Sequence, residues 1–169
     1  MVRACVPGAG VGGHCIAVDP WFIVASAPER ARLIRTAREV NDAKPHKIVG
    51  EIAALADRFK NPTIACYGIT YKPDVDDIRE SPAMEIVAAV AGIEGARVLV
   101  CEPNLAELPA ALKTHGNVSL ADTDAAHETA DIAAFLVGHR AFASLDRDAF
   151  HSKAVVDPIG LFATPGKPA

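Results

Sequence analysis

A cysteine in a glycine-rich stretch is the first candidate for chemistry in this sequence. Residues 7–22 read Pro-Gly-Ala-Gly-Val-Gly-Gly-His-Cys-Ile-Ala-Val-Asp-Pro-Trp-Phe, so four glycines come shortly before Cys15. A thiolate attacks electrophilic carbonyl carbon, and the N–H groups of Gly12 and Gly13 could stabilise the resulting oxyanion. His14 could favour the thiolate, and Asp19 could position a water or hold a neighbouring cation. Cys15 is therefore a candidate nucleophile, although a cysteine near glycines can also be purely structural.

The same glycines fit the pattern G-x-G-x-x-G of dinucleotide-binding loops, from Gly8 to Gly13. That pattern binds a dinucleotide when a strand precedes it and a helix opens at its third glycine. Here Asp19 and Pro20 follow closely, and we expect them to break such a helix. We therefore reject the dinucleotide interpretation and expect a loop built around Cys15.

A second candidate stretch, residues 68–82, reads Gly-Ile-Thr-Tyr-Lys-Pro-Asp-Val-Asp-Asp-Ile-Arg-Glu-Ser-Pro. It leads from an expected strand to the amino terminus of an expected helix, where backbone N–H groups favour anions. Lys72 could meet a phosphate as a point charge, and Arg79 could meet one as a bidentate fork. The aspartates of this stretch would repel phosphate unless they pair with Lys or Arg. A solvated charged loop is the alternative.

The elements around these stretches predict an α/β fold. Residues 28–59 are expected to form two helices or one helix kinked at Pro45, beginning with a capping box of Ser26 and Glu29. After it, strands are expected at 63–67, 97–101, 117–120, 131–137 and 153–157, and helices at 82–91, 105–114, 122–129 and 140–150. Such alternation predicts a mostly parallel sheet flanked by helices, which binds ligands beyond the carboxyl ends of its strands.

Composition and charge exclude several classes of protein. The 169 residues carry a net charge of −4 with no basic run, so we expect no nucleic-acid partner. No apolar stretch approaches the ~20 residues that span a bilayer, so we expect no membrane segment. None of the four cysteines forms a C-x-x-C pair, so we expect no metal site. We expect reduced thiols in the cytoplasm, with Cys66 and Cys101 inert in strands.

Together and in this order, the two stretches resemble the UDP-glucose/GDP-mannose dehydrogenase family. Residues 7–22, the helical text Ala-Arg-Leu-Ile-Arg-Thr-Ala-Arg-Glu-Val-Asn-Asp at 31–42 and the loop at 71–81 carry the resemblance. It covers roughly residues 7–160 and looks most like the branch that acts on UDP-N-acetyl-D-mannosamine. It implies three parts: a cysteine loop with central dimerisation helices at 1–60, a Rossmann-like UDP-sugar-binding domain at 61–160, and a disordered tail at 161–169.

The resemblance also implies a reaction, in which a sugar C6 alcohol is oxidised to a carboxylate with two NAD molecules in turn. The cysteine matching Cys15 adds to the intermediate aldehyde as a thiohemiacetal, which becomes a thioester that water hydrolyses. The aspartate matching Asp19 assists proton transfer. Such oxidations belong to polysaccharide biosynthesis.

The resemblance assigns binding roles as well. Lys72 is implied to hold the nucleotide sugar, and we assign Gly12, Gly13 and His14 to the same substrate site. Arg79 is implied to reach the NAD pyrophosphate. Residues 29–59 are implied to build a homodimer.

The sequence departs from the family pattern at two positions and in one domain. Val18 stands where UDP-glucose members usually carry a lysine, and Pro158 follows Asp157 where many members carry an arginine. The amino-terminal NAD-binding domain of the family is not in this sequence, so we expect the chain alone not to turn over. The alternatives are a non-catalytic module that binds UDP-sugars or dimerises, and a free-standing thiol enzyme such as an acyl transferase.

Overall fold

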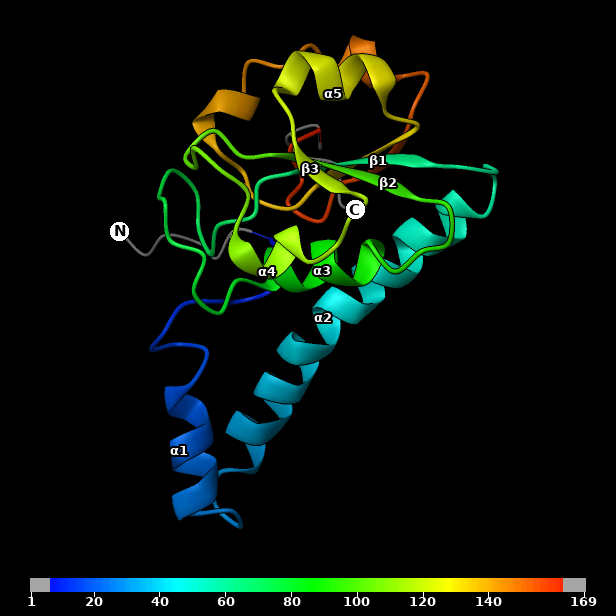
Figure 1. Cartoon of the computed structure of the whole chain (residues 1–169). Coiled ribbons are helices and arrows are strands. Elements are labelled where there is room, and N and C mark those ends of the chain that lie inside the picture. The colour runs from blue at the N-terminus through cyan, green and yellow to red at the C-terminus, as the bar shows by residue number, and fades with distance from the viewer. Residues whose placement is uncertain (1–6, 163–169) are drawn as a thin grey trace.

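Five parallel strands form one sheet in the computed structural model, which describes residues 7–162 (Figure 1). The strand order is β3-β2-β1-β4-β5, and the strands are β1 Thr63–Tyr67, β2 Arg97–Cys101, β3 Val118–Leu120, β4 Ile132–Phe135 and β5 Ala154–Val156. β1 lies at the centre, with Ile64 opposite Val98 of β2 on one side and Ile132 of β4 on the other. The chain therefore changes winding direction between β1 and β4, and their carboxyl ends border the crevice where such sheets bind ligands. The predicted α/β fold is confirmed.

Helices cover both faces of the sheet. On one face lie α3, Pro82–Val90, and the carboxyl-terminal half of α2, Arg32–Ala56, with α4, Ala110–Lys113, beside α3 (Figure 1). On the other face lies α5, Thr123–Thr129. Alternate residues of β1 enter the two cores, Ile64 and Cys66 on the first face and Ala65 and Tyr67 on the second. Burial on both faces explains why these strands are apolar almost throughout.

The helical region agrees with the prediction in part. α2 runs through Pro45 as a single helix, which is one of the two expected arrangements, and α1, Asp19–Ser26, begins at the Asp-Pro pair and not at the third glycine. Proline is tolerated in the first turn, where its missing N–H has no helical partner. The capping box is wrong, because Ser26 ends α1 and its hydroxyl donates to the carbonyl of Ile23 at 3.1 Å.

Burial explains why α2 continues past its proline. An internal proline removes one helical hydrogen bond and costs ~3 kcal/mol or more. Beyond it, Ile48 and Ile52 are completely buried against the sheet, each contributing about 1.5–3 kcal/mol. The packing of the second half of the helix therefore outweighs the local defect.

α1 and the first half of α2 extend away from the sheet as a pair (Figure 1). Several large apolar side chains there face solvent, among them Phe22 at 69% exposure, Leu33 at 82% and Val40 at 68%. A contiguous set of exposed apolar side chains marks an interaction surface more often than a solvated one. Of the helices between residues 7 and 162, none combines the length and apolarity needed to cross a bilayer.

Two later helices are shorter than predicted. Residues 140–150 form two 3₁₀ turns, Arg140–Phe142 and Asp148–Phe150, because Phe142 and Phe150 both turn inward onto Tyr67. α4 begins only at Ala110, because the residue before Pro109 is disfavoured in a helical conformation. Of the expected tail, Phe162 packs with its ring centroid 4.7 Å from that of Phe135, and residues 163–169 lie outside the described residues.

Candidate functional site

Cys15 lies in an irregular loop, residues 7–18, that we call the cysteine loop. Its side chain is exposed, and its carbonyl accepts hydrogen bonds from the N–H groups of Val18 at 3.0 Å and Asp19 at 2.8 Å. These bonds fold residues 15–19 into the turn that opens α1, so Cys15 lies in the turn that precedes the amino-terminal, positive end of that helix. A thiol in such a position is accessible to a reagent or a substrate.

The cysteine loop rests on the connection between β1 and α3, residues 68–81, which we call the Lys72 loop. A side chain at Gly12 would place its Cβ 2.3 Å from the carbonyl oxygen of Glu80, and one at Gly13 would lie 3.1 Å from the Tyr71 ring. The N–H of Val11 also donates to the side chain of Asn41 in α2 at 2.9 Å. The two stretches singled out in the sequence therefore touch, and glycine is needed where they do.

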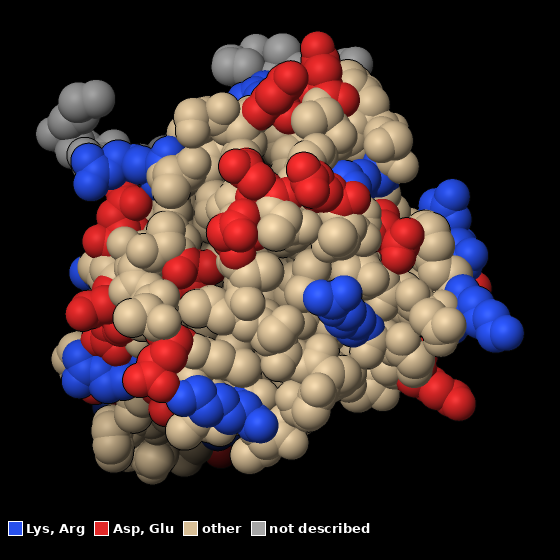
Figure 2. Space-filling view, turned by 45° about the horizontal axis from the view of Figure 1, so that its top comes forward, with Lys and Arg blue, Asp and Glu red and all other residues tan. Residues whose placement is uncertain are grey.

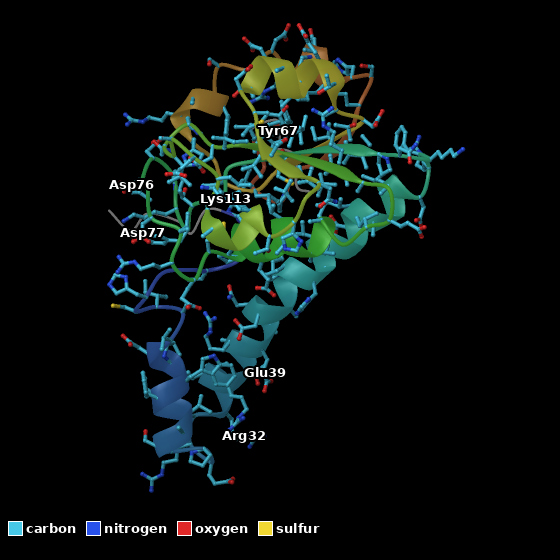
Figure 3. All side chains as sticks on the ribbon, in the orientation of Figure 1. Arg32, Glu39, Tyr67, Asp76, Asp77 and Lys113 are labelled. Atoms are coloured by element: carbon cyan, nitrogen blue, oxygen red, sulfur yellow. The ribbon has the colours of Figure 1, made fainter. Side chains whose placement is uncertain are left out.

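Ion pairs neutralise two of the aspartates of the Lys72 loop. Arg79 binds both carboxylate oxygens of Asp77, with Nη2 at 2.6 Å from Oδ2 and Nε at 3.0 Å from Oδ1. Hydrogen bonds from Arg79 lower the pKa of Asp77 to about 2. Arg140 binds Asp74 through two different groups, with Nε at 2.8 Å from Oδ2 and the backbone N–H donating to Oδ1 at 3.0 Å. Figure 3 shows Asp77 and Asp76 at the outer edge of the loop.

A cavity of about 580 Å³ opens between the two loops at the carboxyl ends of β1 and β4. Its wall combines the cysteine loop, the Lys72 loop and the segments after β4 and β5, including Gly8, Gly10, Thr70, Tyr71, Lys72, Pro82, Leu136, Val137, Gly138, Ile159 and Leu161. Among these described residues, Lys72 carries the charge and most of the rest are apolar or glycine. A nucleotide-sized ligand with one anionic group fits such a wall by size and polarity.

Positively charged side chains are scattered, and not clustered, on the face of the molecule that Figure 2 shows. On the face that Figure 2 shows, Lys and Arg side chains lie scattered among Asp and Glu, and most of the surface is uncharged. A phosphate on this face would therefore meet separate cations and not a broad basic surface. Lys72 is exposed and its Nζ lies 5.1 Å from the centroid of the Tyr71 ring, at the cavity wall.

The predicted site residues fall into two groups. Lys72 lines the cavity, whereas Cys15, His14 and Asp19 are exposed and lie outside its wall. Gly12 and Gly13 lie between the two groups, where the cysteine loop packs against the Lys72 loop. The structure therefore brings the cysteine loop against the Lys72 loop, and Cys15 is exposed outside the cavity wall.

A buried polar cluster at the same edge was missed by sequence reasoning. The side chains of Glu102 and His139 are completely buried, with 3.1 Å between Oε2 and Nε2. Glu102 also accepts hydrogen bonds from the N–H groups of Ile69 at 2.8 Å and Asn104 at 3.0 Å. Polar residues shortly after two buried strands, Glu-Pro-Asn directly after β2 and Gly-His-Arg two residues beyond the end of β4, were the available signal.

Hydrogen bonding decides the charge state of Glu102. Burial raises its pKa, but the hydrogen bonds from His139, Ile69 and Asn104 outweigh burial and leave the pKa below its ordinary value of 4.5. The ionised carboxylate therefore stabilises the fold fully above pH 4.5, and this contribution is lost as the pH falls through the folded-state pKa.

We expect Glu102→Gln to lower the free energy of unfolding by about 1–3 kcal/mol at neutral pH, because an amide donor replaces an acceptor that faces N–H groups. The deficit relative to wild type should shrink as the pH falls. Urea unfolding over about pH 3–7 measures it. The exposed-residue variant Glu94→Gln is the control, and a deficit that stays constant with pH would show that the charge of Glu102 does not matter.

The buried cysteines are expected to be inert, as predicted from the sequence. Burial is the main cause that raises the pKa of Cys66 and of Cys101 to about 12. At about pH 8 only ~10⁻⁴ of each is thiolate, so we expect iodoacetamide to modify Cys15 at least ~100-fold faster in the folded chain. Peptide mass spectrometry after timed alkylation measures each rate. Equal rates would mean that Cys15 is shielded or that the strands open readily.

The described residues do not build a dinucleotide site by themselves. The glycine run leads into α1 through the turn at Cys15, so within the described residues no helix opens at Gly13, where the dinucleotide pattern needs one. The connection from β1 to α3 is the 14-residue loop 68–81, not a short glycine turn. Arg79, which the sequence predicts to reach such a cofactor, is exposed in that loop and pairs with Asp77.

Comparison with known proteins decides the family. The UDP binding domain of the UDP-glucose/GDP-mannose dehydrogenase family matches residues 65–163, and the central domain of the same family matches residues 2–43. The chain belongs to this family. The resemblance inferred from the two loops is therefore confirmed, and both loops fall within matched regions.

Similar proteins cover the whole chain, but the chain covers only part of them. An NDP-N-acetyl-D-galactosaminuronic acid dehydrogenase of Ralstonia nicotianae is 54% identical over 96% of the chain and 38% of its own length. A UDP-N-acetyl-D-mannosamine dehydrogenase of Salmonella typhi is 51% identical over 95% of the chain and 40% of its own length. The chain thus spans about two fifths of the curated relatives that it matches.

A solved structure agrees in fold. The UDP-N-acetyl-mannosamine dehydrogenase of S. aureus superposes with a TM-score of 0.70 at 36% identity, covering 90% of this chain and 34% of that one. Both the sheet domain and most of the helical region therefore have counterparts in this family member.

Proposed function

We propose that this chain supplies the nucleotide-binding domain and the reactive thiol of a nucleotide-sugar 6-dehydrogenase. The observation that carries the proposal is the cavity at the carboxyl ends of β1 and β4, with Lys72 in its wall and the cysteine loop against its rim. A UDP-sugar would place its nucleotide in this cavity and its sugar toward Cys15. Lys72 would hold a phosphate oxygen, and the N–H groups of Gly12, Gly13 and His14 would face the sugar.

In the proposed reaction, the sugar C6 alcohol first becomes an aldehyde. The thiolate of Cys15 adds to the aldehyde carbon, forming a C–S bond and a thiohemiacetal whose oxygen takes up a proton. Loss of a hydride and that proton gives a thioester, and water then cleaves the C–S bond to release a carboxylate and the thiol. Asp19, one helical turn beyond Cys15, would take a proton from the water. NAD, when bound, would accept the two hydrides.

We propose an N-acetylated amino sugar as the substrate, and UDP-N-acetyl-D-mannosamine first. The two curated relatives compared above are named for N-acetylmannosamine and N-acetylgalactosaminuronic acid, so the acetamido group is common to both names. Val18 supports this choice, because UDP-glucose members usually carry a lysine at the matching position.

The exposed apolar side chains of α1 and α2 support a homodimer through residues 29–59. Leu33 and Val40 would be covered by the same surface of a second copy, as symmetric interfaces require. Arg79 would extend from the Lys72 loop toward the NAD pyrophosphate. Residues outside this chain would complete the NAD site, so the chain alone would not turn over.

Thermal denaturation with and without ligand tests the proposal. We expect UDP to raise the melting temperature of the chain, since a ligand at 100 times its Kd stabilises the folded state by about 2.7 kcal/mol. Uridine, which lacks the phosphates that Lys72 would bind, should raise it less. We also expect no NADH from the chain with NAD and UDP-N-acetyl-D-mannosamine. An unchanged melting temperature would refute nucleotide binding. NADH formation would refute the proposal that residues outside this chain are needed to complete the NAD site.

A further inference from the structure

The buried ring of His139 joins the segment after β4 to the Lys72 loop. Its Nδ1 lies 2.9 Å from the backbone nitrogen of Asp74 and 3.0 Å from Nδ2 of Asn104, and its Nε2 lies 3.1 Å from Oε2 of Glu102. A backbone N–H can only donate, so Nδ1 accepts the bond from Asp74. The proton of the neutral ring then sits on Nε2 and is donated to Glu102. Nδ1 is therefore a hydrogen-bond acceptor and Nε2 a hydrogen-bond donor.

Groups on both sides of Lys72 contact this ring, and Arg140 also binds the carboxylate of Asp74. Asp74 has a positive φ of 59°, an unfavourable conformation for a residue with a side chain unless its surroundings hold it. Before Lys72, the Thr70 hydroxyl lies 3.4 Å from Nε2 of His139 and donates to the carbonyl of Lys72 at 2.9 Å. Residues 70–74 thus form a short turn whose two ends meet at one imidazole.

We propose that His139 is a positioning residue, which holds the turn at residues 70–74 so that Lys72 stays at the cavity wall. The bond that it accepts from Asp74 is the decisive one, because it fixes the backbone just after Lys72. The effect on ligand binding rests on the proposed function, whereas the effect on the turn does not. The competing role is structural, in which His139 merely fills space and satisfies the buried Glu102.

Two substitutions separate these roles, because each keeps one of the two hydrogen bonds. In His139→Asn the amide oxygen can take the place of Nδ1 and accept from Asp74, but the side chain is too short to reach Glu102. In His139→Gln the amide nitrogen can take the place of Nε2 and donate to Glu102, but the acceptor for Asp74 is lost. His46→Gln, at a largely exposed side chain on α2, is the matched control.

The measurements are amide hydrogen exchange of Asp74 by NMR and UDP affinity by calorimetry, both on the full chain. We expect Asp74 to exchange about 10-fold faster in His139→Gln than in His139→Asn, and UDP to bind about 10-fold more weakly to the Gln variant. Equal exchange rates and affinities in the two variants would overturn the positioning role in favour of the structural one. Slower exchange and tighter UDP binding in His139→Gln than in His139→Asn would do the same.

Two further outcomes remain decisive. If wild-type chain does not bind UDP, the proposed function fails, and the order of the Asp74 exchange rates still decides the role of His139. If a variant does not fold, the ¹⁵N shifts of the wild-type imidazole decide it. An unprotonated Nδ1 supports the proposal, and a proton on Nδ1 overturns it, because the bond from Asp74 could then not form.

Discussion

Gly12→Ala is expected to push the cysteine loop off the Lys72 loop. The new Cβ would lie 2.3 Å from the carbonyl oxygen of Glu80 and 2.8 Å from Cδ of Pro82, so backbone must move. Overpacking of this kind costs about 1–3 kcal/mol, which corresponds to a fall of roughly 2–4 °C in melting temperature for each kcal/mol. Differential scanning calorimetry measures the fall, and changed amide shifts of Tyr71 and Glu80 would locate it.

Gly50→Ala is the matched control for this prediction. Gly50 lies within α2, and a Cβ there would meet nothing within 4 Å. Alanine favours a helix over glycine by about 1 kcal/mol, so this variant should be neutral or more stable. If Gly12→Ala were as stable as the control and left the Tyr71 and Glu80 amides unchanged, the two loops would not be in contact.

Lys72→Met is expected to weaken UDP binding by about 10- to 100-fold with little change in stability, because a hydrogen bond to a charged group is worth about 1.5–3 kcal/mol. Lys72 is exposed and methionine retains most of its apolar stem, so the fold should tolerate the change. Calorimetric titration with UDP in low and high salt measures the affinity. The salt dependence of binding should be smaller in the variant, because one screened charge is gone.

Lys60→Met controls for a general loss of charge. Lys60 precedes β1 and therefore lies at the amino edge of the sheet, opposite the cavity. We expect its UDP affinity to equal that of wild type. Equal losses in both variants would point to a long-range charge effect, and no loss in Lys72→Met would remove Lys72 from the site.

The resemblance to the family, and not composition alone, predicted that the two loops belong together. Gly12 and Gly13 were assigned to the substrate site, whereas the structure shows that they approach the carbonyl of Glu80 and the ring of Tyr71. The sequence also showed that the aspartates of the Lys72 loop need cationic partners. The partner of Asp74 could not be identified, because Arg140 lies in the segment after β4, 66 residues away.

Tertiary context explains the remaining differences. The sequence left open two helices or one helix kinked at Pro45, and the burial of Ile48 and Ile52 outweighs the lost helical bond, so α2 continues as one helix. The pair of Glu102 and His139 depends on strand order, because β2 and β4 flank β1 and their following segments both reach the Lys72 loop. Strand order cannot be read from periodicity, so that cluster could not be assembled from the sequence.

The most direct test of the account is an NMR titration of ¹⁵N-labelled chain with UDP. Two cavities open at the carboxyl edge of the sheet, the one lined by Lys72 and another of about 380 Å³ beside Pro103 and Asp122. The account predicts saturable shifts at the amides of Gly10, Lys72 and Gly138. Shifts confined to the amides near Asp122, or no saturable shifts in the folded chain, would contradict it.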